Sequence, residues 1–165
     1  MIGPLAKIVS GGQTGVDRGA LDAALEAGFP CGGWATHDRI AEDGRIPDRY
    51  PLLELAGAGY EERTRKNVLE SDGTAILYFG ELEGGTRLTM EYCVEHGRPF
   101  EPIDASRLLS TDAALQLSAF VRHNRITVLN FAGPRASKQP RAYGYARDTV
   151  RHLLKSLRWR KPAQR

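Results

Sequence analysis

Short apolar runs, glycine-containing loops and helical patterns follow one another three times along this chain. The apolar runs lie at 6–9, 74–79 and 126–131, and the helical patterns that follow them lie at 16–27, 86–96 and 143–157. Strand, loop and helix repeated in this order are typical of a parallel sheet with crossover helices. The pattern therefore predicts an α/β fold, a Rossmann-like three-layer sandwich with a mostly parallel central sheet.

The ends of the first two helical patterns support this prediction. Glycine and then proline follow each of them, in Gly28-Phe29-Pro30 and in Gly97-Arg98-Pro99. Glycine closes the last turn of a helix in the left-handed conformation, and proline stops the helix from continuing. We expect the next strands at 31–35 and 100–103, and two further helices at 60–70 and 111–123.

The stretch 36–59 breaks the pattern. It is rich in glycine and proline, has little periodicity, and predicts a long surface excursion with a short turn of structure at 52–56. Irregular loops of this length inside compact domains are often functional. The chain has no linker or low-complexity segment, so we expect one domain over 1–155 and a basic tail over 156–165.

Charge is concentrated at the carboxyl end. The chain has a net charge of +3, but residues 155–165 hold five basic residues and no acidic one. The rest of the chain then has 18 basic and 20 acidic residues, so it lacks the basic stripe typical of a nucleic-acid-binding domain. We expect no nucleic-acid partner and a solvated tail.

Cysteine content and hydropathy indicate the compartment. Cys31 and Cys93 are too few for a disulfide framework or a structural zinc site. No segment approaches the ~20 apolar residues of a membrane span. We expect reduced thiols, no membrane partner and a cytoplasmic location.

The first loop gives the sharpest functional signal. Its glycines allow a ligand to approach the backbone closely, and the helix that follows presents free N–H groups to an anion. Asp17 is interpreted in two ways, as a helix cap or as an acceptor for a ligand hydroxyl. A tight strand-to-helix turn without a ligand is the alternative for the whole loop. The candidate phosphate-binding residues here are Gly11, Gly12, Gln13, Thr14, Gly15 and Asp17.

The second loop repeats this arrangement. Gly84 and Gly85 precede a helix start that carries Thr86 and Thr89, which predicts a second anion-facing helix end. Thr86 alone would be an ordinary N-cap. Glu91 farther along the helix is either a ligand-orienting or acid–base carboxylate or an exposed helical glutamate.

Other candidates lie in the third loop and beside it. Arg135 and Lys138 suit phosphate or carboxylate contacts, with solvated loop charges as the alternative. Arg63 and Asn67 share a helix face, which is either a ligand contact or an ordinary polar surface. Trp34 either stacks on a ligand ring or packs beneath the excursion. Because loops at the carboxyl ends of parallel strands meet at one edge, we expect one shared crevice.

Catalytic and metal-binding patterns are missing from the sequence. The four histidines are scattered without metal-ligand spacing, and no serine, cysteine or histidine stands beside an obvious catalytic partner. The sequence therefore predicts a protein that binds a phosphate-bearing ligand, with no catalytic residue and no metal site.

Five segments resemble the molybdenum carrier family, a circularly permuted YpsA-like branch of the SLOG superfamily. They read SGGQTGVDRGALD at 10–22, AEDGRIPDRYP at 41–51, RTRKNVLESD at 63–72, GGTRLT at 84–89 and LNFAGPRASK at 129–138. Together they span nearly the whole chain up to about residue 155, in the order typical of that family. One departure is Trp34-Ala35-Thr36, where Trp-Cys-Pro is common in the family.

The resemblance implies a Rossmann-like fold, a homo-oligomer (dimer or tetramer), and binding of the molybdenum cofactor, a phosphorylated pterin with a metal-binding dithiolene. The family's ligand motifs fall on Gly11, Gly12, Thr14, Gly84, Gly85, Thr86, Arg135 and Lys138. A nucleotide is the alternative ligand, because the superfamily also includes phosphoribohydrolases and nucleotide sensors. The hydrolases have a PGGxGTxxE-type motif, and the spacing from Thr86 to Glu91 departs from it.

Overall fold

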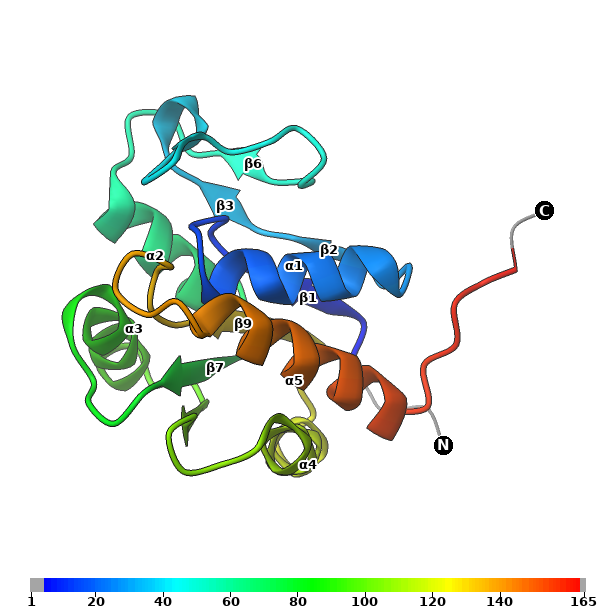
Figure 1. The fold of residues 1–165 in the computed structure, drawn as a ribbon. Coiled ribbons are helices and arrows are strands. Elements are labelled where there is room, and N and C mark those ends of the chain that lie inside the picture. The colour runs from blue at the N-terminus through cyan, green and yellow to red at the C-terminus, as the bar shows by residue number, and fades with distance from the viewer. Residues whose placement is uncertain (1–4, 164–165) are drawn as a thin grey trace.

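The computed structural model describes residues 5–163 and confirms the α/β prediction. Its central sheet has the strand order β2-β1-β9-β7-β8, and every neighbouring pair is parallel. The strands are β1 (Lys7–Val9), β2 (Cys31–Gly32), β7 (Gly73–Tyr78), β8 (Phe100–Asp104) and β9 (Val128–Ala132). Strand β9, at the centre, joins the β1–β2 pair to the β7–β8 pair (Figure 1).

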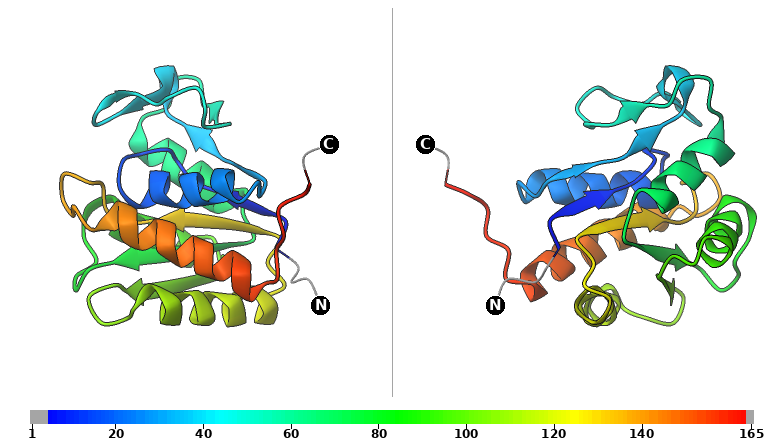
Figure 2. Two further views of the ribbon diagram at one scale, coloured as in Figure 1. Left: turned by 45° about the vertical axis from the view of Figure 1, so that its right-hand side comes forward. Right: turned by 180° about the vertical axis from the view of Figure 1, so that it is seen from behind.

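Helices cover both faces of this sheet, which gives three layers. On one face α5 packs between α1 and α4, and on the other α2 packs beside α3 (Figure 2). The helices are α1 (Val16–Glu26), α2 (Tyr60–Leu69), α3 (Gly84–Glu95), α4 (Ser110–His123) and α5 (Ala142–Ser156). The predicted helices are all present, with ends shifted by one or two residues.

The two faces of the sheet differ in polarity. The large apolar core lies under α1, α4 and α5, and it includes the fully buried Leu77 and Leu129. The opposite face of the same strands carries polar groups at its centre, where Asn130 Nδ2 donates to Thr74 Oγ1 at 3.3 Å. This polar face lies beneath α2 and α3.

The single strand expected at 31–35 is wrong. The chain pairs with β1 only as far as Gly32, and β3 (Trp34–Ala35) leaves the central sheet to pair with β6 (Leu53–Glu54). The break falls at Gly33, which has a φ of 127°. A Cβ at Gly33 would lie 2.1 Å from the Ser10 carbonyl oxygen, so this close approach requires glycine.

Residues 36–59, which we call the lobe, are more ordered than the predicted surface excursion. They contain a 3₁₀ turn, η1 (His37–Arg39), a hairpin of β4 (Ile40–Ala41) and β5 (Gly44–Arg45), and β6. The lobe has a small apolar core of its own, which includes Ile46, Tyr50 and Leu52 and packs on α1 through Leu21. Sequence periodicity missed this core because no element in it is longer than three residues.

A buried arginine holds the lobe together. The guanidinium of Arg39 donates to the carbonyl oxygens of Ile46 at 3.2 Å, Pro47 at 2.8 Å, Tyr50 at 3.0 Å and Leu52 at 3.0 Å. Arg39 is only 8% exposed and adopts a φ of 54°. One side chain therefore satisfies the carbonyls of a segment that has almost no regular backbone pairing.

The chain beyond α5 is partly anchored. The Trp159 ring meets the Phe29 ring edge-on, with centroids 4.8 Å apart, and Trp159 Nε1 donates to the Ala27 carbonyl at 3.0 Å. Residues 160–163 are exposed, and Arg165 lies outside the described residues. Among the described residues, no helix combines the length and the apolar character that crossing a bilayer requires.

Candidate functional site

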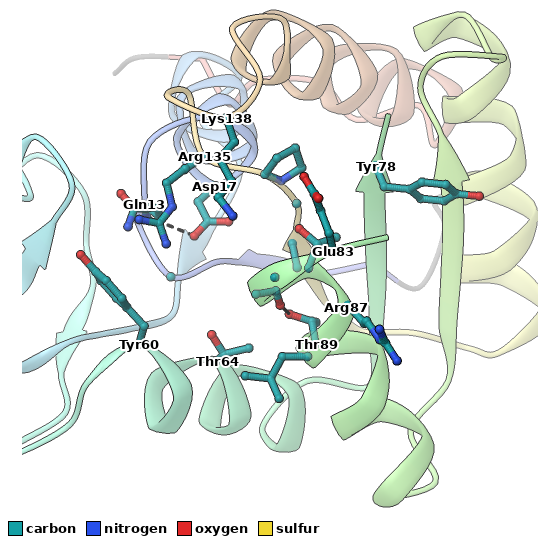
Figure 3. A pocket seen from close by; sticks show the side chains of 18 of the residues that line it. Gln13, Asp17, Tyr60, Thr64, Tyr78, Glu83, Arg87, Thr89, Arg135 and Lys138 are labelled. Atoms are coloured by element: carbon teal, nitrogen blue, oxygen red, sulfur yellow. Dashed lines mark hydrogen bonds between the residues drawn. The ribbon is translucent and has the colours of Figure 1, made fainter. Parts of the chain in front are cut away.

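A pocket of about 550 Å³ opens at the carboxyl ends of β1, β7 and β9, between the starts of α2 and α3 (Figure 3). The three glycine-containing loops meet there, as parallel strands require. Most of the residues predicted from the sequence line it: Gly11, Gln13, Asp17, Arg63, Asn67, Gly84, Gly85, Thr86, Thr89, Arg135 and Lys138. The expectation of one shared crevice is therefore confirmed in the geometry.

The other predicted residues lie beside the pocket without lining it. A Cβ at Gly12 would meet Leu52 of the lobe at 2.5 Å, and one at Gly15 would meet the Pro134 carbonyl oxygen at 2.3 Å. These glycines allow the first loop to pack against the lobe and the third loop. Trp34 lies against α2, where Trp34 Nε1 donates to Glu70 and the Lys66 ammonium lies 5.1 Å from the ring centroid.

Asn67 is fully engaged in holding the β3 segment. Its Oδ1 accepts from the Trp34 backbone N–H at 2.8 Å, and its Nδ2 donates to the Trp34 carbonyl at 3.0 Å. This pair of bonds imitates a strand pairing between α2 and β3. Asn67 thus shapes the pocket wall by fixing a backbone segment.

The protein itself occupies several donors at the start of α1. The N–H of Gln13 donates to Asp17 Oδ2 at 3.1 Å, Thr14 N–H donates to Gln13 Oε1 at 3.0 Å, and Val16 N–H donates to the Pro134 carbonyl at 3.2 Å. The Asp17 side chain does not cap α1, whose N-cap residue is Gly15; it accepts from a backbone N–H of the loop before the helix. This helix end therefore presents fewer free donors than its glycine-rich sequence indicates.

The start of α3 is open by comparison. Within residues 5–163, the N–H groups of Gly84, Gly85 and Thr86 have no acceptor, and Glu83 at the N-cap makes no side-chain cap. Lys138 Nζ lies 3.3 Å from the position of a Cβ on Gly84, so the ammonium is next to these N–H groups. Free N–H groups, the positive end of the helix dipole and a cation all favour an anion here.

Asp17 and Arg63 form a buried ion pair in the floor of the pocket. Arg63 Nη1 lies 3.5 Å from Asp17 Oδ2, and both side chains are about 10% exposed. Burial raises the pKa of Asp17, although Arg63 and the backbone donors favour its charged form, and burial lowers the pKa of Arg63. A Cβ on Gly11 would lie 2.0 Å from Arg63 Nη1, so glycine there leaves room for the guanidinium.

Glu42 of the lobe joins the first and third loops at the rim of the pocket. Its carboxylate accepts from Thr14 Oγ1 and from the N–H and hydroxyl of Ser137, and Arg135 Nε lies 4.0 Å away. Burial opposes the charged carboxylate, but the Ser137 and Thr14 hydroxyls outweigh it and lower the pKa of Glu42. Thr14 thus connects the first loop to the lobe and to the third loop, because its hydroxyl donates to Glu42 and accepts from the Ala136 N–H at 3.1 Å.

Sequence reasoning missed Tyr60, which lines the pocket, and Glu42, which lies beside it. Tyr60 begins α2 directly after Gly59, and its ring lies 5.7 Å from the Arg63 guanidinium and 5.5 Å from that of Arg135. An aromatic residue at a helix start that follows the irregular stretch was a usable signal. Glu42 offered none, because its partners are 28 and 95 residues away in the sequence.

The remaining side chains of the pocket limit its chemistry. Glu91 is paired with Arg87, with 3.1 Å between Arg87 Nε and Glu91 Oε1, and both side chains are more than half exposed. The described residues that line the pocket include no cysteine, histidine or methionine. The described lining can therefore bind anions and polar groups, but it supplies no soft ligand for a transition metal.

Comparisons with known proteins place the chain in a family. A crystal structure described as that of a "Putative molybdenum carrier protein" from Syntrophus aciditrophicus is similar to it, with 43% identity and a TM-score of 0.89. The match covers 92% of this chain and 96% of that one. No curated protein sequence matches the chain significantly. The sequence model of the circularly permutated YpsA SLOG family matches residues 8–154, and the chain therefore belongs to this family.

Proposed function

We propose that this protein is a carrier that binds the molybdenum cofactor through the cofactor's phosphate. The observation that supports this most directly is the open start of α3, where the N–H groups of Gly84, Gly85 and Thr86 have no acceptor among the described residues and Lys138 Nζ lies close to Gly84. The relative from Syntrophus aciditrophicus, described as a putative molybdenum carrier, supports the choice of ligand.

The pocket fits this ligand in size and in chemistry. Its volume of about 550 Å³ lies within the range of roughly 300–1,000 Å³ found for small-molecule sites. The phosphate would lie at the start of α3, and the rest of the molecule would extend toward Asp17 and Arg63. Since the described lining has no thiol, thioether or imidazole, the cofactor's own dithiolene would hold the molybdenum cargo.

The choice of a carrier over a phosphoribohydrolase is supported by the sequence and by the relative. The spacing from Thr86 to Glu91 departs from the hydrolase motif, and Glu91 is paired with Arg87. The relative from Syntrophus aciditrophicus is described as a putative molybdenum carrier. We therefore propose a carrier rather than a phosphoribohydrolase. The cytoplasmic location and the homo-oligomer stay predictions from the sequence.

The experiment loads purified protein with freshly released molybdenum cofactor and measures how much stays bound and intact over time. Native mass spectrometry identifies the ligand, and reconstitution of a cofactor-dependent enzyme measures the intact fraction. Lys138→Met keeps the length of the side chain and removes its charge, so we expect about 10-fold weaker binding, the loss of about 1.4 kcal/mol.

Lys155→Met is the matched control, because Lys155 is an exposed lysine on α5 outside the residues that line the pocket. We expect it to bind the cofactor as the parent protein does. If the parent protects the cofactor no better than serum albumin does, or if both lysine variants bind equally well, the proposed function is wrong.

A further inference from the structure

The end of the pocket away from α3 contains an aromatic ring close to two guanidinium groups. Tyr60 lines the pocket and is 37% exposed, and the guanidinium carbons of Arg63 and Arg135 lie 5.7 and 5.5 Å from its ring centroid. Figure 3 shows Tyr60 and Arg135 at one end of the pocket, and Glu83 and Thr89 toward the other. The Tyr60 ring and the Arg135 guanidinium are both more than a third exposed, and planes of this kind stack on planar rings.

Buried hydrogen-bond donors without partners adjoin this end. Gln13 Nε2 and Arg63 Nε are buried and have no hydrogen-bond acceptor among the described residues. Each belongs to a side chain that lines the pocket, and both residues are more than nine-tenths buried. Buried donors without acceptors are rare and costly in folded proteins, which points to a partner supplied from outside the chain.

The charges at this end argue against a second phosphate. The guanidinium of Arg63 faces the Asp17 carboxylate at 3.5 Å, and that of Arg135 faces Glu42 at 4.0 Å. Both cations are therefore balanced by the protein, and another dianion would be repelled by the two carboxylates. A neutral ring with acceptor atoms meets the stacking planes and the free donors without this repulsion.

We propose that the Tyr60 end of the pocket is a subsite for a planar heteroaromatic ring that carries hydrogen-bond acceptors. The site then selects phosphomonoesters that bear such a ring over sugar phosphates that lack it. This inference rests on the proposed function for the position of the phosphate. It adds a specificity that the α3 end cannot provide, because N–H groups and an ammonium recognise any phosphomonoester.

The test measures affinities by calorimetry with three probes: ribose 5-phosphate, guanosine 5′-monophosphate and neopterin 3′-monophosphate. Stacking of one base on an aromatic side chain contributes about 1–3 kcal/mol. We expect the two ring-bearing probes to bind the parent protein at least about 5-fold more tightly than ribose 5-phosphate. Tyr60→Leu should remove this advantage and leave the affinity for ribose 5-phosphate unchanged.

Two further variants separate stacking from recognition by the Tyr60 hydroxyl or by the charge of Arg135. Tyr60→Phe keeps the ring and loses the hydroxyl, so it should keep the preference for ring-bearing probes. Arg135→Lys keeps the charge and loses the planar guanidinium, so it should lower the affinity for ring-bearing probes several-fold more than the affinity for ribose 5-phosphate. Circular dichroism verifies that each variant is folded.

The outcomes distinguish this inference from the proposed function. If no probe binds the parent, the proposed phosphate site is wrong and this inference falls with it. If ribose 5-phosphate binds as tightly as the ring-bearing probes, or Tyr60→Leu lowers all three affinities equally, the ring subsite alone is overturned. Loss of the preference in Tyr60→Phe would also overturn it, because the hydroxyl would then be the recognised group.

Discussion

Arg39 gives the sharpest prediction about stability, because four carbonyls of the lobe depend on its one guanidinium. The four hydrogen bonds measure 2.8–3.2 Å, and the side chain is almost fully buried. In Arg39→Met all four hydrogen bonds are lost. The Pro47 and Tyr50 carbonyls still accept from backbone N–H groups, whereas those of Ile46 and Leu52 have no other donor among the described residues. At about 1 kcal/mol for each hydrogen bond lost, the free energy of unfolding should fall by about 4 kcal/mol. Arg39→Lys should recover only part of this loss, since one ammonium cannot reach all four carbonyls.

Tryptophan fluorescence allows the lobe to be observed by itself. The chain has only Trp34 and Trp159, and Trp34 lies in β3 at the base of the lobe. In a Trp159→Phe background, urea denaturation followed at Trp34 reports on this region. Arg45→Met is the matched control, because Arg45 is an exposed lobe arginine that pairs with exposed Asp48. An Arg39→Met protein that unfolds within about 1 kcal/mol of the parent would refute the reasoning.

Three further predictions follow from the site and the carboxyl end. Glu42→Gln should lower the free energy of unfolding by about 1 kcal/mol at neutral pH. Because folding lowers the pKa of Glu42, this difference between variant and parent should vanish as the pH falls below the ordinary glutamate pKa. Urea titrations at a series of pH values measure the difference. Arg63→Met leaves the Asp17 carboxylate buried without its cation, so stability should fall by about 3–5 kcal/mol at pH 7.5. Because burial raises the pKa of Asp17, its carboxyl binds a proton more tightly in the folded protein, so the loss of stability in Arg63→Met should shrink in thermal melts at lower pH. A loss of stability that stays constant with pH would contradict this prediction. Trp159→Ala should cost about 2 kcal/mol in thermal unfolding, through lost contact with Phe29, and an unchanged midpoint would show that the tail is not anchored.

The fold was predictable from the sequence wherever an element was long enough to show its period. The runs at 74–79 and 126–131 correspond to β7 and β9, and the helical patterns correspond to all five helices. The strand expected at 31–35 failed because Gly33 turns the chain out of the sheet, and the contact that requires this is with Ser10. A contact between residues so far apart in the sequence leaves no local pattern.

The sequence predicted where the candidate site lies better than it predicted the contacts within the site. Parallel strands bring their carboxyl ends together, so the three loops had to meet. The sequence favoured the first loop as the anion site, whereas the geometry leaves α3 the more open helix end. The reason is that Asp17 and the Pro134 carbonyl occupy donors at the start of α1. The sequence does not specify these partners, because one of them lies in another loop.

The central position of β9 has a consequence for how the protein is made. A nascent chain that has emerged only as far as α4 contains both outer strand pairs but not the strand that hydrogen-bonds to each of them. The two halves of the sheet cannot be joined until synthesis passes Ala132, and long-range pairing of this kind is slow to form. Arg135 and Lys138 are synthesised later still. The nascent protein should therefore expose apolar strand edges for most of its time on the ribosome, and it should acquire affinity for its ligand only at the end.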